Sequence, residues 1–160
     1  MMDKCLLRVA GPEAKAACGT NQLTVGVEVG IEGAIHAMRV LWEEHNQEED
    51  WGFLLIDAHN AFIEENRKAM LWEVRNDLPI GARFAFNCYR HCATLVIRSG
   101  NGNGHFLYSK EVLTQRDPLE MVAYRLGILP LIRYLRTDHP SLTQPWYTDD
   151  SEEGGTLADI

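Results

Sequence analysis

The chain has 160 residues, of which 46% are hydrophobic and 24% charged, and its formal net charge is −8. This is enough for one domain with a hydrophobic core, and no apolar run reaches the roughly 20 residues that a membrane helix needs. The first residues lack the basic, apolar and cleavage segments of a signal peptide. We therefore expect an intracellular protein, in the nucleus or the cytoplasm, with no membrane partner.

The charge is unevenly distributed along the chain. Residues 78 to 136 contain eight Lys or Arg and three acids, a local balance of +5, so the remainder carries −13. Such a separation suits an acidic pocket beside a track for a polyanion, and it suits a solvated charged surface equally well.

The cysteines do not form a metal-binding pattern. Cys5, Cys18, Cys88 and Cys92 include no CxxC pair, and the group of Cys88, His91 and Cys92 lacks the second half of a zinc site. We therefore expect reduced thiols, most of them buried.

The first predicted elements are a helix and a strand. Residues 30–50 form an amphipathic pattern with apolar residues at helical spacing, namely Ile31, Ile35, Met38 and Leu41 or Trp42. The apolar run "WGFLLID" that follows predicts a buried strand ending at Asp57. A rigid sheet would hold this carboxylate in place while leaving it accessible.

The middle of the chain predicts helices and a hairpin. Residues 64–79 form a second helix with Met70, Leu71 and Val74 inward and Pro79 beyond its end. Residues 82–93 favour a further helical piece, and residues 93–115 predict a β-hairpin. The turn "GNGNG" is not a phosphate-binding loop, because no Gly-Lys-Ser/Thr follows it.

A long core helix is predicted after the hairpin. Asp117 and Pro118 suit its N-cap and first position, and Pro130 is expected to kink it. One face of this helix carries Leu119, Val122, Leu126 and Leu129. The chain then shows a short strand at residues 142–147, a turn at 148–151 and the beginning of another strand at 155–160.

This order of elements predicts an α+β fold of the ferredoxin-like, split βαβ kind, with an antiparallel sheet and helices on one face. In that topology the strand ending at Asp57 lies beside the hairpin that carries Asp149 and Asp150. Three converging carboxylates would bind hard divalent cations such as Mg²⁺. A turn or a helix cap would explain each aspartate taken alone.

Three stretches together resemble a known enzyme family. "LLIDAHNAF", "TQRDPL" and "YTDD" follow the patterns D-x-x-x-A-F, Q-x-D-P-L and Y-x-D-D in that order. They resemble motifs A, B and C of reverse transcriptases, most closely those of retrotransposons without long terminal repeats. The resemblance implies a polymerase palm over residues 51–160, with motif A at 57–62, motif B at 112–119 and motif C at 147–150, preceded by part of the fingers over residues 1–50 that includes the amphipathic helix.

The resemblance also implies a reaction and its residues. An RNA-directed DNA polymerase of this family adds a dNTP to a primer 3′-hydroxyl on an RNA template, using two Mg²⁺ or Mn²⁺ ions. Phe62 would exclude the ribose 2′-hydroxyl, Gln115 would lie near the nucleotide and the template, and Tyr147 would shape the primer-end pocket. Basic residues of the hairpin would contact the nucleic-acid backbone. The catalytic and metal-binding residues would be Asp57, Asp149 and Asp150.

The chain departs from the family at motif B and at both ends. The glycine that normally follows the motif B glutamine is Arg116 here, and a second glycine is Val112. The basic finger residues, the primer grip and the thumb have no counterpart, so we expect a longer polyprotein to supply them. Three hypotheses follow: an active reverse transcriptase, an inactive retroelement remnant that retains some metal or nucleic-acid binding, and another palm-type enzyme such as an RNA-copying polymerase or a nucleotide cyclase.

Overall fold

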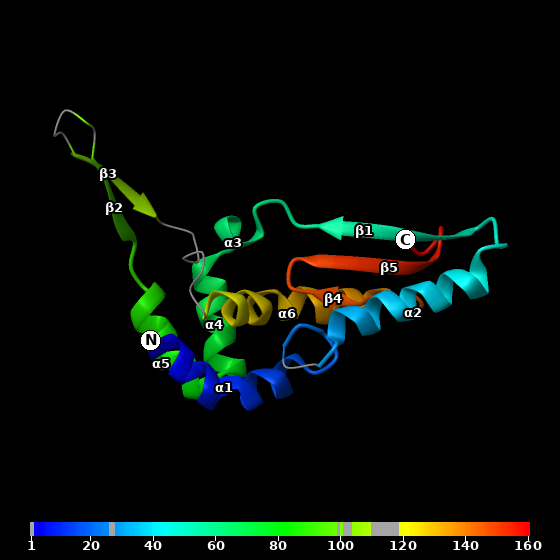
Figure 1. The fold of residues 1–160 in the computed structure, drawn as a ribbon, viewed down its shortest axis with the longest axis horizontal. Helices are drawn as coiled ribbons and strands as arrows, with labels where there is room; N and C mark the ends of the chain where they lie inside the picture. Colours follow the sequence, from blue (N-terminus) through cyan, green and yellow to red (C-terminus); the bar gives the residue numbers. More distant parts are fainter. Residues whose placement is uncertain (1, 26–27, 99, 101–103, 110–118) are drawn as a thin grey trace.

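The computed structural model describes residues 2–25, 28–98, 100, 104–109 and 119–160. They form a mixed α+β fold with one three-stranded and one two-stranded antiparallel sheet (Figure 1). The described elements are, in chain order, α1 (Met2–Cys18), α2 (Gly30–His45), β1 (Trp51–Asp57), α3 (Ala61–Glu64), α4 (Arg67–Asp77), α5 (Pro79–Tyr89), β2 (Ala93–Arg98), β3 (Gly104–Ser109), α6 (Glu120–Asp138), β4 (Trp146–Tyr147) and β5 (Asp150–Thr156).

The main core lies between helices α1, α4, α5 and α6 rather than under a sheet. The sequence did not predict α1. Its buried side chains are small and recur every fourth residue, at Ala10, Ala14 and Cys18. Such a stripe lets another helix backbone approach closely, and α1 contacts α4, α5 and α6.

Helices α4 and α5 form a tight helical pair. Asn66 caps α4, since its side-chain oxygen accepts hydrogen bonds from the N–H groups of Lys68 (3.1 Å) and Ala69 (3.0 Å). Met70 and Val74 are buried, as predicted, and Leu71 is half-buried. Pro79 occupies the first turn of α5 instead of only terminating α4, so the predicted helical piece begins earlier than residue 82.

The predicted long helix is confirmed as α6. Leu119, at its N-cap, and Leu126 and Leu129 within it are fully buried, whereas Val122 is half-buried. Pro130 lies within the helix. The predicted N-terminal pair of Asp117 and Pro118 lies outside the described residues.

The three-stranded sheet has the order β1-β5-β4. Strand β5 begins at Asp150, earlier than the strand predicted at 155–160, and it is the central strand. It pairs with β1 along its whole length and with β4 through a tight hairpin. Side chains alternate between the two faces of a sheet along each strand. This register therefore determines the face on which each carboxylate of β1 and β5 lies.

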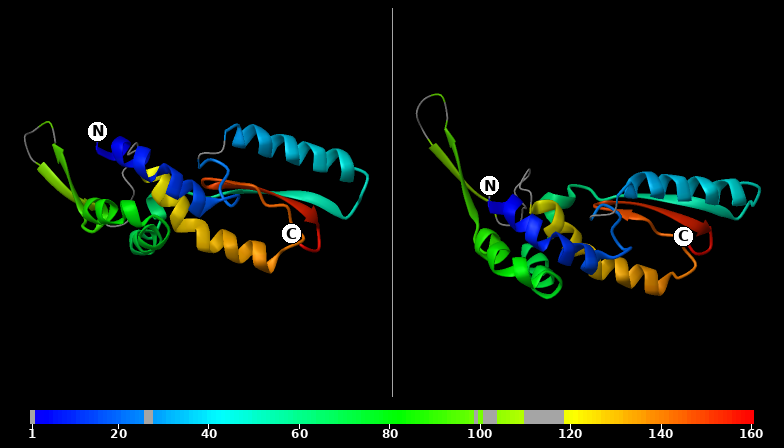
Figure 2. Two further views of the ribbon diagram at one scale, coloured as in Figure 1. Left: turned by 90° about the horizontal axis from the view of Figure 1, so that it is seen from below. Right: turned by 60° about the horizontal axis from the view of Figure 1, so that its bottom comes forward.

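Helices α2 and α6 lie on opposite sides of this sheet (Figure 2). The predicted inward face of α2 is wrong at its N-terminal half, since Ile31 and Ile35 are exposed while Ala34 and Met38 are buried. Aromatic contacts with β1 set this orientation: Trp42 lies 6.1 Å from Phe53 between ring centroids, and His45 stacks on Trp51 at 4.8 Å.

The predicted hairpin is confirmed as β2 and β3, which extend away from the helices (Figure 1). Its apolar side chains are exposed on both faces. The expectation that most cysteines are buried is wrong: all four are free, but only Cys18 is buried. Within the described residues, no helix is long and apolar enough to cross a bilayer.

The packing of α6 gives a direct test of where the core lies. Leu126→Ala should lower the free energy of unfolding by about 2–5 kcal/mol, because it opens a cavity at a fully buried position. Leu131→Ala in the same helix, whose side chain is 51% exposed, should change it by less than about 0.5 kcal/mol. Urea unfolding of both variants measures the difference, and equal effects would place the core elsewhere.

Candidate metal centre

Three carboxylates meet where β1 ends and β5 begins. Asp57 is the last residue of β1 and Asp150 the first of β5, and the two are direct partners in the antiparallel register. Asp149 lies in the turn before Asp150, and its carbonyl accepts a hydrogen bond from the N–H of Ala58 (3.3 Å). One carboxylate oxygen from each aspartate lies within 4.8 Å of the others. The predicted meeting of these three residues is therefore confirmed.

No described cationic side chain forms a direct ion pair with the three carboxylates. Partial burial raises the pKa of Asp150, and the charges of Asp149 and Asp57 raise it further. The donor set is all oxygen, two of the three side chains are exposed and the third is half-buried, so a cation could reach all of them. These properties fit a hard divalent cation such as Mg²⁺ or Mn²⁺, although exposed acids also occur without one.

The turn that carries the cluster is held by Gln22, a fully buried residue of the loop after α1. Thr148 has a left-handed backbone (φ 65°), which is unfavourable for a β-branched residue. Its N–H donates to Gln22 Oε1 at 2.7 Å, and Gln22 Nε2 donates back to the Thr148 carbonyl at 3.1 Å. This reciprocal pair stabilises the left-handed residue and so fixes the direction of the two aspartates after it.

The Thr148 side chain is held from α6. Arg125 donates from Nε (3.0 Å) and Nη2 (2.9 Å) to Thr148 Oγ1. Because these donors occupy both lone pairs of the hydroxyl oxygen, the Thr148 O–H donates to Thr24 Oγ1, 3.2 Å away. We call Gln22, Thr24, Arg125 and Thr148 the turn clamp. No sequence pattern predicts it, because its members are far apart in the chain and only Thr148 lies within a motif.

Arg125 places a buried positive charge beneath the carboxylates. Burial lowers its pKa, while the charges of Cys18 and Asp149 act in the opposite direction. Burial also raises the pKa of the Cys18 thiol to about 11, so this cysteine stays protonated near neutral pH. The guanidinium thus offsets part of the repulsion within the cluster without using its donors on a carboxylate.

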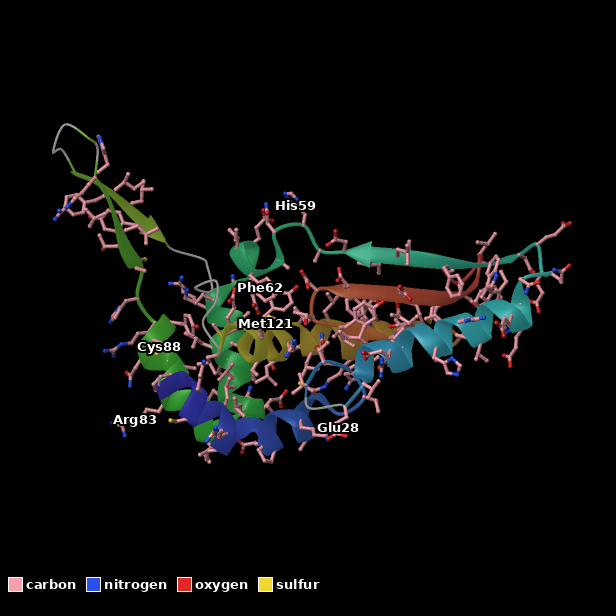
Figure 3. The ribbon with its side chains drawn as sticks, viewed as in Figure 1. Glu28, His59, Phe62, Arg83, Cys88 and Met121 are labelled. Atoms are coloured by element: carbon pink, nitrogen blue, oxygen red, sulfur yellow. The ribbon has the colours of Figure 1, made fainter. Side chains whose placement is uncertain are left out.

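The two described aromatic residues of the predicted site lie near the cluster. Phe62 is part of α3 (Figure 3) and packs on buried Tyr124 of α6, with ring centroids 4.7 Å apart. Burial raises the pKa of Tyr124, as do the charges of Glu65, Asp149 and Asp150. Tyr147 pairs with Asp150 in the β4–β5 hairpin. The predicted Gln115, with Arg116 and Val112, lies outside the described residues.

Glu65 is a buried carboxyl that the sequence did not single out. Its Oε2 has no hydrogen-bond partner among the described residues, and burial raises its pKa to about 8. Its other oxygen occupies the space where a Cβ at Gly127 would be, which explains a glycine inside α6. Glu65 is therefore a site where folding and protonation are coupled.

No known protein family, curated protein or solved structure matches this chain.

The raised pKa of Glu65 predicts a pH-dependent stability. The folded state holds its proton up to about pH 8, whereas the unfolded carboxyl releases it near 4.5. The free energy of unfolding should therefore fall as pH rises through this interval, by about 3 kcal/mol between pH 5.5 and 8.5. Glu65→Gln should flatten this profile in urea unfolding experiments, and the neighbouring exposed Glu64→Gln should not. Equal profiles for Glu65→Gln and the unmodified chain would contradict the assignment.

The turn clamp predicts different effects for two similar substitutions. Thr148→Val keeps the side-chain shape but removes the oxygen that accepts both Arg125 donors. We expect a loss of about 1–3 kcal/mol in unfolding free energy and a loss of about 10- to 100-fold in Mn²⁺ affinity, measured by electron paramagnetic resonance. Thr148→Ser keeps the oxygen and should bind Mn²⁺ nearly normally. Equal affinities of the two variants would show that the clamp does not position the aspartates.

Proposed function

We propose that the chain is the palm region of a retroelement reverse transcriptase that transfers nucleotides with two divalent cations. The observation that carries this proposal is the convergence of Asp57 with Asp149 and Asp150, because motifs A and C, from which they come, are far apart in the sequence. The mixed α+β architecture and the antiparallel pairing of the two motif strands agree with it. Residues 51–160 would be the palm and residues 1–50 part of the fingers.

The chain's own residues would act mainly by positioning. Asp57, Asp149 and Asp150 would hold two Mg²⁺ or Mn²⁺ ions. When bound, such ions activate an attacking hydroxyl and stabilise a leaving oxygen in phosphoryl transfer. The turn clamp holds two of the three carboxylates on a rigid hairpin, so little reorganisation is needed when a cation binds.

The remaining predicted site residues would define the substrate. Phe62, backed by Tyr124, would limit the space beside the sugar and favour a deoxynucleotide. Tyr147 would lie at the primer end, since it precedes the aspartates in the same hairpin. Gln115 would contact the nucleotide and the RNA template. A DNA primer, a dNTP and the fingers and thumb of a longer polyprotein complete the expected set of partners.

One sequence feature favours a second candidate, an inactive remnant that retains metal or nucleic-acid binding. Arg116 stands where the family has glycine. A glycine at that point lets the backbone approach the base pair closely, and a bulky side chain fills the same space. The carboxylate cluster could then still bind a cation while nucleotide addition fails.

A primer-extension assay with the full chain distinguishes the two candidates. We expect extension of a DNA primer on an RNA template with Mg²⁺ or Mn²⁺ and a preference for dNTPs over ribonucleotides. Asp149→Ala, which removes a cation ligand, should lower the rate by more than about 100-fold. Asp159→Ala, at an acidic residue outside the cluster, serves as the matched control.

The outcomes separate the hypotheses. Equal background for the unmodified chain and Asp149→Ala excludes activity of this chain, and gain of extension in Arg116→Gly would trace that loss to motif B. Mn²⁺ binding that Asp149→Ala leaves unchanged would refute the metal centre itself. A preference for ribonucleotides would favour another palm-type enzyme.

A further inference from the structure

The helical pair α4–α5 has a grooved outer surface. Two adjoining hollows, of about 270 Å³ and 290 Å³, lie along it and share Leu71 as a wall. Each helix contributes a stripe of residues spaced i, i+3 and i+7 to this groove. The stripes are Lys68, Leu71 and Arg75 on α4, and Arg83, Phe86 and Arg90 on α5. The two stripes run in opposite directions, so both ends of the groove are basic and its middle is apolar.

The four cationic side chains of the groove are available to a ligand. Lys68, Arg75, Arg83 and Arg90 are all exposed, and no described carboxylate forms an ion pair with any of them. Arg83 extends away from the body of the molecule (Figure 3). Of the acids on α4, Asp77 faces α6 and pairs with Arg133 at 3.2 Å. None of the residues that line the two hollows is acidic.

The groove is positively charged although the chain as a whole has a negative net charge. The whole chain carries −8, yet the groove is lined by Lys68, Arg75, Arg83 and Arg90 and by no described acid. A random surface of an acidic protein would place carboxylates among these cations. The separation therefore favours a polyanionic ligand over simple solvation.

The middle of the groove suits a flat apolar group. Phe86 is 50% exposed beside half-buried Leu71, and the Arg90 guanidinium lies 5.6 Å from the Phe86 ring centroid. At the other end Arg75 lies 5.9 Å from the ring of exposed Trp72. Exposed aromatic rings interleaved with Arg are typical of surfaces on which nucleic-acid bases stack.

The spacing of the cations matches a nucleic-acid strand. The cations form two pairs, Lys68 with Arg90 and Arg75 with Arg83. The two pairs are about 10 Å apart along the helices, because seven residues of α-helix span that length. Three nucleotides of one strand rise about 10 Å, at roughly 3.4 Å each. Phosphates at both cation pairs would leave a base between them, over Phe86.

We infer that the α4–α5 groove binds a single strand of nucleic acid, with phosphates on the two cation pairs and a base stacked on Phe86. The proposed contacts are independent of base sequence, because phosphate contacts and ring stacking do not read base edges. The groove is built by elements other than those that carry the acidic cluster. It therefore does not require a metal ion or a catalytic reaction.

The inference is tested by fluorescence anisotropy with labelled oligo(dT) and oligo(U), in EDTA so that the metal centre plays no part. Arg75→Ala combined with Arg83→Ala should weaken binding about tenfold and reduce the slope of log K against log salt by about 1.4, at 0.7 per lost phosphate contact. Arg8→Ala combined with Arg39→Ala removes the same charge at exposed positions outside the groove and should leave both values nearly unchanged.

A second pair of variants separates stacking from charge. Phe86→Ala should weaken binding roughly 5- to 150-fold without changing the salt slope, because a base loses its stacking partner while the cations remain. Phe86→Tyr, which keeps the ring, should bind normally. The inference would be overturned if the groove and control double variants lost the same amount of affinity. It would also be overturned if Phe86→Ala bound the oligonucleotide as tightly as the unmodified chain. Competition by poly-glutamate as strong as by oligo(dT) would identify an acidic protein partner instead.

The test of groove binding and the test of polymerase activity can fail independently of each other. Asp149→Ala should retain groove binding, so failure of primer extension with intact groove binding counts only against the catalytic proposal. Primer extension that persists while the groove variants bind like the control counts only against the groove.

Discussion

The position of the acidic cluster depends on one residue, Thr148. Its left-handed backbone conformation costs of the order of 1–2 kcal/mol for an L-residue with a side chain. The β-branched side chain of threonine does not reduce this cost. Hydrogen bonds from Gln22 and Arg125 stabilise this conformation from the loop after α1 and from α6. One turn of four residues thereby connects the N-terminal region, the central helix and the sheet. The geometry of the cluster is consequently a property of the tertiary structure and not of its local sequence.

The same interaction directs Arg125 to Thr148 and leaves the carboxylates without an ion pair from this arginine. A buried guanidinium close to Asp149 could have formed an ion pair with it, and the carboxylates would then have been partly neutralised by the protein. Instead Nε and Nη2 of Arg125 both donate to a hydroxyl oxygen. The arginine lowers the local repulsion through its field while the carboxylate oxygens stay free for a cation. Any cation that binds only the folded chain would further stabilise it by mass action.

The sequence predicted the parts of this structure that rest on local patterns. The strand ending at Asp57, the hairpin of β2 and β3, and the buried leucines of α6 followed from periodicity and turn residues. The predicted burial of that strand was wrong: no residue of β1 is buried, and Leu55 is 73% exposed. That Asp57 lies beside the hairpin carrying Asp150 followed from topology, whereas the register that makes them direct partners did not, because Asp150 was predicted in a turn. Helix α1 was missed because a stripe of alanines is a weak hydrophobic signal. The rotation of α2 and the turn clamp depend on contacts between different elements, Trp42 with Phe53 for α2 and Gln22 with Thr148 for the clamp, which no local pattern contains.

Acidic and basic residues are concentrated in different parts of the molecule. Residues 28 to 57, which include α2 and β1, contain eight acids and one arginine, whereas α5 and the β2–β3 hairpin contain no acid. Figure 1 places α2 near one end of the longest axis and α5 with the hairpin near the other. The acidic cluster lies where β1 ends and β5 begins. A field of this shape repels a polyanion from the α2 end and attracts it to the helical pair. A strand held on the basic end would have to approach the carboxylates against their own charge, and a bound cation at the cluster is the simplest way to reverse that repulsion.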